Sequence, residues 1–252
     1  PGTVNEKTAL DHLTLRLEAG DFATVIGGNG AGKSTMLNAI AGVWLIDEGS
    51  IRIDGADVTE LSEHRRALHL GRVFQDPMVG TAGDMTIEEN LALAARRGER
   101  RTLRWGIKKG ERDKFRELLK PLGLGLEDRL TAKVGLLSGG QRQALTLLMA
   151  ALKKPKVLLL DEHTAALDPK TAAKVLELSD KVVEENRLTT LMVTHNMKDA
   201  IAHGNRLIML DAGRVILDIS GEDKKKLTVP DLLARFSKAS GEEVESDRLL
   251  LA

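Results

Sequence analysis

The sequence predicts an α/β fold with a mostly parallel sheet, an antiparallel β subdomain and a helical insert. Three observations lead to this prediction. A glycine-rich loop joins an apolar, strand-like segment at residues 22–26 to a helix-like segment at residues 35–41. The continuous apolar run at residues 157–160 is typical of a parallel strand that is buried on both faces. Strand-like and helix-like segments then alternate, which is the pattern of a sheet covered by helices.

The composition favours a folded domain that does not bind nucleic acid. The chain has 252 residues, which is enough for one α/β domain with a sizeable insert. Lys plus Arg and Asp plus Glu both number 37, whereas nucleic-acid-binding proteins usually have a basic excess. The absence of cysteine excludes disulfides and cysteine-based metal sites. The longest apolar runs, such as residues 147–152, are too short to cross a bilayer.

The first 75 residues are expected to hold short strands around the glycine-rich loop. Residues 13–17 alternate apolar and polar side chains, which is the period of a strand, and residues 22–26 form the next strand. Gly42 is suited to end the helix that follows the loop, because glycine readily adopts the left-handed conformation. The Asp-Gly pair at residues 54–55 predicts a tight hairpin. A further strand is predicted at residues 70–75.

Residues 76–136 are interpreted as a helical subdomain that is inserted into the α/β core. Thr86 and Glu89 predict a capping box, in which each side chain accepts a hydrogen bond from the other residue's backbone N–H. Residues 96–112 are dense in Arg, Lys and Glu. This stretch is either a solvated surface of the insert or a contact with a membrane partner or lipid headgroups.

The core is predicted to comprise residues 1–75 and 137–220, followed by a helical tail at residues 221–252. Strands are expected at residues 157–161 and 188–194, and a hairpin around residues 211–213. Helices are predicted to begin at Ser138, at Asp168 with a proline in the first turn, and at Asn196. An amphipathic helix in the tail is expected around Leu232, Leu233 and Phe236.

The glycine-rich loop is predicted to bind the phosphates of a nucleotide. It is a G-x-x-x-x-G-K-S pattern in the strand–loop–helix context that the pattern requires. Glycines allow backbone N–H groups to turn toward phosphates, and a helix N-terminus attracts anions. Lys33 is expected to reach the β- and γ-phosphates, and the Ser34 hydroxyl to bind Mg²⁺. The predicted nucleotide-binding residues here are Gly27, Gly28, Asn29, Gly30, Ala31, Gly32, Lys33, Ser34 and Thr35.

Two further stretches are candidates for the same chemistry. In a phosphate-loop fold, Asp161 at the end of a buried strand is placed to hold Mg²⁺ through water. Glu162 is the better candidate for polarising the attacking water. A second anion-binding helix N-terminus, or simply a well-capped helix, is predicted at Ser138, Gly139, Gly140 and Gln141. Two such devices for one nucleotide site suggest that each binds the nucleotide of a different subunit.

Together these stretches resemble the ATP-binding subunits of ATP-binding cassette (ABC) transporters. They occur in the order of the family and extend over residues 13–217. The matching stretches are residues 27–34 (Walker A), Gln75 (Q-loop), residues 137–141 (the LSGGQ signature), residues 157–162 (Walker B with its glutamate), residues 166–168 (D-loop) and His195 (switch histidine).

The resemblance implies a P-loop NTPase of ABC type that hydrolyses ATP with Mg²⁺. Two copies would pack head to tail, with each ATP between one copy's Walker A and the other's signature helix. It implies that Ser34, Gln75 and Asp161 surround Mg²⁺, that Glu162, His195 and Gln75 act in catalysis, and that Asp168 crosses the dimer interface. The aromatic residue that stacks on adenine in the family would fall near residue 1. It is either missing from this sequence or replaced by weaker stacking, since the chain contains no tyrosine.

The resemblance also implies partners and a location. Separate transmembrane permease subunits and a solute-binding protein are expected, with the chain in the cytoplasm at the inner face of the cell membrane. Residues 73–81 and 161–168 look like importer-type subunits, some of which are linked to amino acids. The alternative is a soluble ABC ATPase that moves no solute, such as a cluster-assembly ATPase. Neither alternative includes a nucleic-acid partner.

Overall fold

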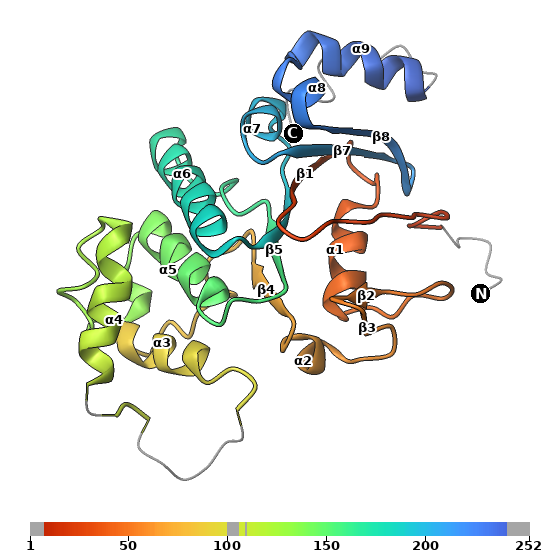
Figure 1. The fold of residues 1–252 in the computed structure, drawn as a ribbon. Coiled ribbons are helices and arrows are strands. Elements are labelled where there is room, and N and C mark those ends of the chain that lie inside the picture. Colours follow the sequence, from red (N-terminus) through yellow and green to blue (C-terminus); the bar gives the residue numbers. More distant parts are fainter. Residues whose placement is uncertain (1–7, 100–105, 109, 241–252) are drawn as a thin grey trace. The chain divides into compact units, whose positions relative to one another are not determined.

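The computed structural model describes residues 8–99, 106–108 and 110–240 (Figure 1). The chain forms two compact units: Pro1–Glu63 together with Thr189–Ala252, and His64–Leu188. Among the described residues, no helix combines the length and the hydrophobicity that a membrane span requires. The predicted division at residues 75/76, 136/137 and 220/221 stays a prediction.

The first unit is built on four strands that pair side by side in the order β6-β1-β7-β8. β1 pairs in parallel with β6 and with β7, and β7 pairs antiparallel with β8. The strands are β1 (Phe22–Ile26), β6 (Thr189–Val193), β7 (Arg206–Asp211) and β8 (Arg214–Ser220). Every residue of β1 is buried, as expected for a continuous apolar strand with a neighbour on each side. The strands predicted around residues 22–26 and 188–194 and the hairpin at residues 211–213 are confirmed.

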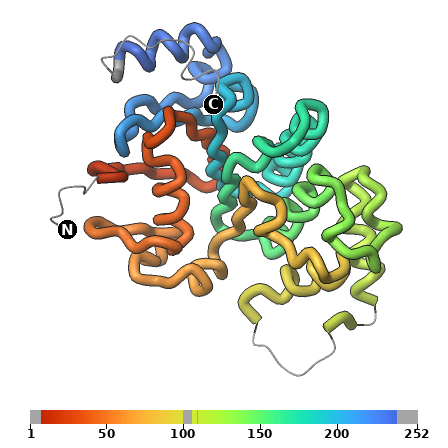
Figure 2. The backbone as a smooth tube through the Cα atoms, turned by 180° about the vertical axis from the view of Figure 1, so that it is seen from behind, coloured from red at the N-terminus to blue at the C-terminus, as the bar shows by residue number. Residues whose placement is uncertain are grey.

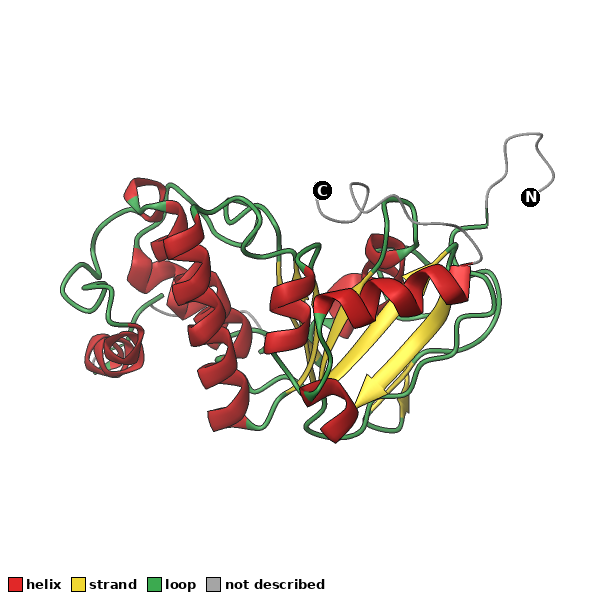
Figure 3. Ribbon diagram, turned by 90° about the horizontal axis from the view of Figure 1, so that it is seen from above, coloured by secondary structure: helices red, strands yellow, loops and turns green. Residues whose placement is uncertain are grey.

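Helices cover the strands of this unit, as Figure 3 shows. They are α1 (Lys33–Ala41), α7 (Met197–Ala202), α8 (Gly221–Lys225) and α9 (Val229–Ser240). α9 is the predicted amphipathic helix: Leu232 and Phe236 are buried in one core cluster with Met209 and Ile219 of the sheet. The short helix α8 precedes it and was not predicted. A two-stranded hairpin, β2 (Arg52–Ile53) and β3 (Ala56–Asp57), confirms the predicted Asp-Gly turn.

The strand predicted at residues 13–17 is wrong. These residues form no strand in the described part of the chain. Their side chains do alternate between half-buried and exposed, so the period of two is present in an extended segment. An alternating pattern identifies which side chains face the core, but a strand also requires a partner whose ladder of hydrogen bonds it can join.

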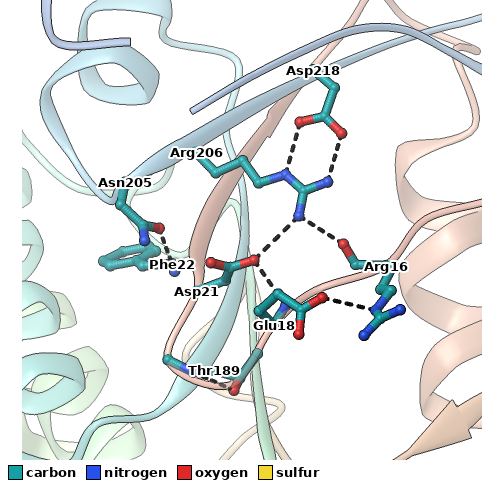
Figure 4. A network of polar contacts seen from close by, with 9 residues as sticks. Arg16, Glu18, Asp21, Phe22, Thr189, Asn205, Arg206 and Asp218 are labelled. Carbon is teal, nitrogen blue, oxygen red and sulfur yellow. Dashed lines mark hydrogen bonds and ion pairs between the residues drawn. The ribbon is translucent and has the colours of Figure 1, made fainter. Parts of the chain in front are cut away.

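A polar network ties the strands of the first unit together at the amino end of β1 (Figure 4). The Arg206 guanidinium donates two hydrogen bonds to the Asp218 carboxylate, at 2.7 and 2.6 Å. It also donates to the Arg16 carbonyl oxygen at 2.6 Å and to Asp21 Oδ2 at 3.2 Å. The hydrogen bonds to Asp218, and then those to Asp21, raise the pKa of Arg206 further above its ordinary value. The bidentate geometry is the strong form of this ion pair, so it fixes β7 against β8.

The second unit contains two parallel strands and most of the long helices. Its strands are β4 (Leu70–Val73) and β5 (Val157–Asp161), and a short helix α2 (Glu63–Arg66) precedes β4. Its other helices are α3 (Ile87–Ala95), α4 (Glu111–Leu119), the 3₁₀ turns η1 (Lys120–Leu122) and η2 (Val134–Leu136), α5 (Gly139–Ala151) and α6 (Pro169–Asn186). Figure 2 shows α3, α4 and α5 as the neighbouring yellow and green segments. A Cβ atom at Gly71 would lie 2.6 Å from the Ala150 carbonyl oxygen, so only glycine lets α5 pack this closely on β4.

The predicted helix starts of the second unit are confirmed. Thr86 Oγ1 accepts a hydrogen bond from Glu89 N at 3.3 Å, and Glu89 Oε2 accepts one from Thr86 N at 2.7 Å. Ser138 and Asp168 are the N-caps of α5 and α6, and Pro169 occupies the first turn of α6. These elements begin where local hydrogen bonding predicts, because a cap satisfies N–H groups that the helix itself leaves without partners.

Part of the basic stretch at residues 96–112 lies outside the described residues. In the described part, Arg96 donates to both carboxylate oxygens of Glu111, at 2.9 and 2.8 Å. Arg112 donates to the buried Glu88 at 2.6 and 2.8 Å. These arginines therefore stabilise the packing of α3 against α4, and the alternative of a membrane contact stays a prediction.

Candidate nucleotide-binding site

The predicted phosphate loop of the first unit has the backbone shape that anion binding requires. It follows β1 directly, and Gly30 and Gly32 have the left-handed conformation, with φ of 82° and 98°. A Cβ atom at Gly27 would clash with the carbonyl oxygen of Leu210 in β7, so this position also needs glycine. Gly32 is the N-cap of α1, and no side chain caps this helix. The first N–H groups of α1 are therefore not bonded by a capping side chain, which suits a phosphate ligand.

Lys33 is folded back into the loop. Its Nζ donates to the Gly27 carbonyl oxygen at 2.7 Å and to the Gly28 carbonyl oxygen at 3.1 Å, and its side chain is buried. These bonds hold the curvature of the loop and place a positive charge where phosphates would bind. Ser34, which follows in the first turn of α1, is exposed.

His195 lies at the same edge of the sheet as the phosphate loop. In the parallel register of β1 and β6, Val25 pairs with Val193. The phosphate loop begins two residues after Val25, and His195 comes two residues after Val193, so both follow the carboxyl ends of adjacent strands. Ligands of open α/β sheets bind at this edge. The first unit thus brings together two of the stretches that the sequence singled out.

The second unit places Asp161 at the carboxyl end of β5, and Glu162 and Gln75 just beyond the carboxyl ends of β5 and β4. Val73 pairs with Leu160 in the register of β4 and β5, so Gln75 and Asp161 lie at one edge. Gln75 is exposed, while Asp161 and Glu162 are half-buried. Among the described residues, no cluster of three His, Cys, Asp or Glu side chains could hold a metal ion. The oxygens of the Asp161 carboxylate and the Gln75 amide are ligands of the kind that Mg²⁺ takes, and this ion takes its remaining ligands from phosphates and water.

Glu162 has a strained backbone. Its φ is 46°, in the left-handed region that non-glycine residues rarely adopt, and it begins a turn in which Ala165 N donates to the Glu162 carbonyl oxygen at 2.9 Å. Such strain costs on the order of 1–3 kcal/mol and is concentrated at functional sites. The turn leads to Asp168, whose Oδ1 accepts from Thr171 N at 3.1 Å. Hydrogen bonds from the Thr171 side chain and backbone lower the pKa of the Asp168 carboxyl.

The signature residues form the N-terminus of α5 with a complete capping box. The Ser138 hydroxyl accepts from Gln141 N at 3.3 Å, and Gln141 Oε1 accepts from Ser138 N at 3.2 Å. Gln141 also donates to the Leu124 carbonyl oxygen at 3.2 Å. A Cβ atom at Gly140 would clash with the side chain of Thr171 in α6, so the glycine allows the two helices to approach. Ser138 and Gly139 are exposed.

Two side chains of α5 that the sequence did not single out support these motifs. Gln143, which is buried, donates from Nε2 to the Phe74 carbonyl oxygen at 3.0 Å, directly before Gln75. Arg142 donates to the carbonyl oxygens of Val134 and Gly135, at 3.1 and 3.0 Å, and also bonds the sulfur of Met78. α5 therefore fixes both the chain after β4 and the turn before the signature. The only sequence signal was their position next to the signature glycines.

His163, to which the sequence assigned no role, is buried in the second unit. Its Nε2 lies 2.9 Å from the Ser179 hydroxyl, and that hydroxyl donates to the Val175 carbonyl oxygen at 2.8 Å. With the hydroxyl proton directed at Val175, the hydroxyl oxygen is the atom that faces His163. This histidine therefore anchors the turn after Glu162 to α6.

Comparisons with known proteins agree with the motifs. The ABC transporter family model matches residues 10–165. The chain is 47% identical to the tyrosine transport ATP-binding protein of Clostridioides difficile (strain R20291), over 92% of each chain. It is 33% identical to the methionine import ATP-binding protein MetN of Rhizobium etli, over 94% of this chain and 68% of the relative.

Solved structures show the same fold. The dimeric post-hydrolysis state of the ATP-binding cassette MJ0796 bound to ADP and Pi is similar with a TM-score of 0.72 and 32% identity. The match covers 87% of this chain and 94% of that one. The ADP conformation of the ABC transporter cassette MJ1267 has a TM-score of 0.75 at 27% identity, over 93% and 94% of the two chains. The chain therefore belongs to the ABC transporter family, in which it is an ATP-binding and ATP-hydrolysing subunit.

Proposed function

We propose that this subunit powers the import of an amino acid or a closely related small solute. The observation that carries the proposal is the 47% identity to a tyrosine transport ATP-binding protein over 92% of both chains. The methionine import relative supports the same direction of transport and the same class of solute. The importer-like stretches at residues 73–81 and 161–168 are consistent with both relatives.

The proposal assigns each site residue a task. Lys33 and the N–H groups of residues 27–35 bind the nucleotide phosphates, which the loop conformation and the uncapped α1 favour. Gln75, Glu162 and His195 act on the attacking water, with Glu162 as the residue that polarises it. Ser34, Gln75 and Asp161 hold Mg²⁺, which neutralises charge on the phosphates when it is bound.

The proposal also includes partners. A second copy of the chain supplies Ser138, Gly139, Gly140, Gln141 and Asp168 to each nucleotide, which the dimeric MJ0796 structures support by similarity. Transmembrane permease subunits form the path for the solute, and a solute-binding protein delivers it. The subunit then works in the cytoplasm, at the inner face of the cell membrane.

Reconstitution tests the proposal. The chain would be co-expressed with a candidate permease and solute-binding protein from the same organism, purified as a complex and placed in proteoliposomes. We expect ATP enclosed inside the proteoliposomes to drive uptake of labelled tyrosine or another amino acid from the outer medium, and the solute-binding protein added outside to stimulate hydrolysis. If the chain does not co-purify with a permease and hydrolyses ATP alone, the soluble ABC ATPase is the better assignment.

A further inference from the structure

We infer that Arg72 is a positioning residue that orients Asp161 for Mg²⁺. The inference rests on the proposed function, which assigns Asp161 to the metal. The two residues lie 89 positions apart in the sequence, and neither the motifs nor their spacing connects them.

The strand register brings the two side chains onto one face. β4 and β5 are parallel, and Arg72 pairs with Leu159. Side chains two residues apart along a strand share a face, so Arg72 and Phe74 lie on the same face as Leu159 and Asp161. The opposite face carries Gly71 and Leu158, where α5 packs on β4. The ion pair therefore forms away from α5, at the edge of the second unit where Gln75 and Asp161 lie.

The contact is close and mostly withdrawn from water. Arg72 Nη2 lies 2.8 Å from Asp161 Oδ2, and the side chains are only 12% and 16% exposed. An unpaired carboxylate at this depth would lose solvation without compensation. Arg72 supplies the compensating charge and holds the Asp161 carboxylate in a defined orientation.

The guanidinium itself is held in place by Phe74. Its central carbon lies 4.7 Å from the centroid of the Phe74 ring, in a cation–π arrangement. Arg72 Nε is buried and has no hydrogen-bond partner within the described part of the chain. The ion pair with Asp161 and the contact with the Phe74 ring together restrict the conformations of the Arg72 side chain. The guanidinium is therefore held rigidly against Asp161.

The two oxygens of the Asp161 carboxylate have different roles in this arrangement. Arg72 donates to Oδ2, and Oδ1 is the oxygen that we assign to the metal. A ligand whose second oxygen is fixed loses less conformational freedom when it binds a metal, which is why residues behind a ligand contribute about 10- to 100-fold to metal affinity. The positive charge of Arg72 would by itself weaken the binding of Mg²⁺. We expect the fixed orientation of the Asp161 carboxylate to outweigh this repulsion.

The test measures how strongly Mg²⁺ is coupled to ATP binding. The parent is the Glu162→Gln variant of the chain, which is expected to bind ATP without turnover. The dissociation constant of a fluorescent ATP analogue is measured with saturating Mg²⁺ and with EDTA, and the ratio of the two reports the contacts between metal and protein. We expect Arg72→Met to reduce this ratio by about 10-fold or more. Arg72→Lys keeps the positive charge but lacks the planar guanidinium, so we expect its ratio to lie between those of Arg72→Met and the parent.

A matched control separates positioning from general damage. Arg96 forms a two-bond ion pair with Glu111 in the same unit. Arg96→Met should lower the free energy of unfolding and leave the ratio unchanged. An unchanged ratio in Arg72→Met would overturn the inference, and so would an increase, which would show that Arg72 competes with the metal. If the parent itself shows no effect of Mg²⁺ on ATP binding, the proposed assignment of Asp161 fails instead.

Discussion

The two helix N-termini that were predicted to bind phosphate are equipped differently. α1 begins after Gly32 and has no side-chain cap. α5 begins after Ser138, where the hydroxyl of Ser138 and the amide of Gln141 satisfy two backbone N–H groups in a capping box. α1 therefore has no capping side chain that a phosphate would have to displace, whereas in α5 the capping box already bonds the N–H groups of Ser138 and Gln141.

This difference indicates how each helix would respond to ATP. At α1 a phosphate displaces no capping side chain. At α5 it must compete with the capping box for Ser138 and for the N–H groups of the first turn, so binding at α5 is weaker when it acts alone. A helix with this construction suits a nucleotide that is already held by the loop of another subunit.

The largest effect is expected from Glu162→Gln, which prevents turnover and isolates the binding steps. Loss of a general base slows a reaction by about 10²- to 10⁴-fold. With the ATP intact, the α5 helices of two chains can complete two nucleotide sites. Light scattering with and without Mg-ATP should show a monomer that becomes a dimer. Turnover at the wild-type rate would refute the role of Glu162, and a monomer at saturating ATP would refute the contribution of α5.

The next largest effect distinguishes α1 from α5 by their contributions to nucleotide binding within one chain. Lys33→Ala removes a charged hydrogen-bond donor from the loop, so affinity for a fluorescent ADP should fall on the order of 100-fold. Ser138→Ala should leave ADP affinity within about 2-fold, since hydrogen bonds not made to the ligand contribute nothing to its binding. Equal losses in the two variants, measured at a protein concentration where the chain is monomeric, would contradict the comparison.

A smaller effect is expected when the capping box of α5 is compared with the capping box of α3, for which no ligand is predicted. Thr86 and Glu89 form the corresponding capping box at α3. Thr86→Ala and Ser138→Ala should each lower the free energy of unfolding by about 1 kcal/mol, which is typical for loss of an N-cap. Urea denaturation measures both. Only Ser138→Ala should also weaken ATP-induced dimerisation in the Glu162→Gln background; a similar loss in Thr86→Ala would assign the effect to stability alone.

The smallest effect concerns pH. Hydrogen bonds from the Thr86 backbone N–H, and then from its side chain, lower the pKa of Glu89 in the folded chain. A carboxyl whose pKa is lowered by folding contributes stability above its unfolded pKa and loses that contribution as the pH falls through the folded value. The difference between wild type and Thr86→Ala should therefore shrink in acid, whereas that for Ser138→Ala should not, because Gln141 does not titrate. Urea denaturation at several pH values checks this; identical pH dependence would contradict it.

Local patterns in the sequence were sufficient for the helix starts and most of the strands. The caps at Thr86, Ser138 and Asp168 and the turn at Asp54-Gly55 depend on hydrogen bonds between residues at most three apart. The apolar runs of β1, β5 and β6 identify strands that are buried on both faces. The phosphate loop belongs to the same class, since its glycines, Lys33 and Ser34 are contiguous.

The tertiary structure decided what depends on distant residues. Residues 13–17 have the alternation of a strand, but none of the described strands forms a ladder with them. Arg72 meets Asp161 only because β4 and β5 pair in parallel in one particular register. His163 is anchored by Ser179, which α6 brings back from 16 residues away. The sequence by itself determined the local conformations and the contiguous motifs, because their hydrogen bonds are short-range. Register and helix packing determined which of the separated side chains could pair.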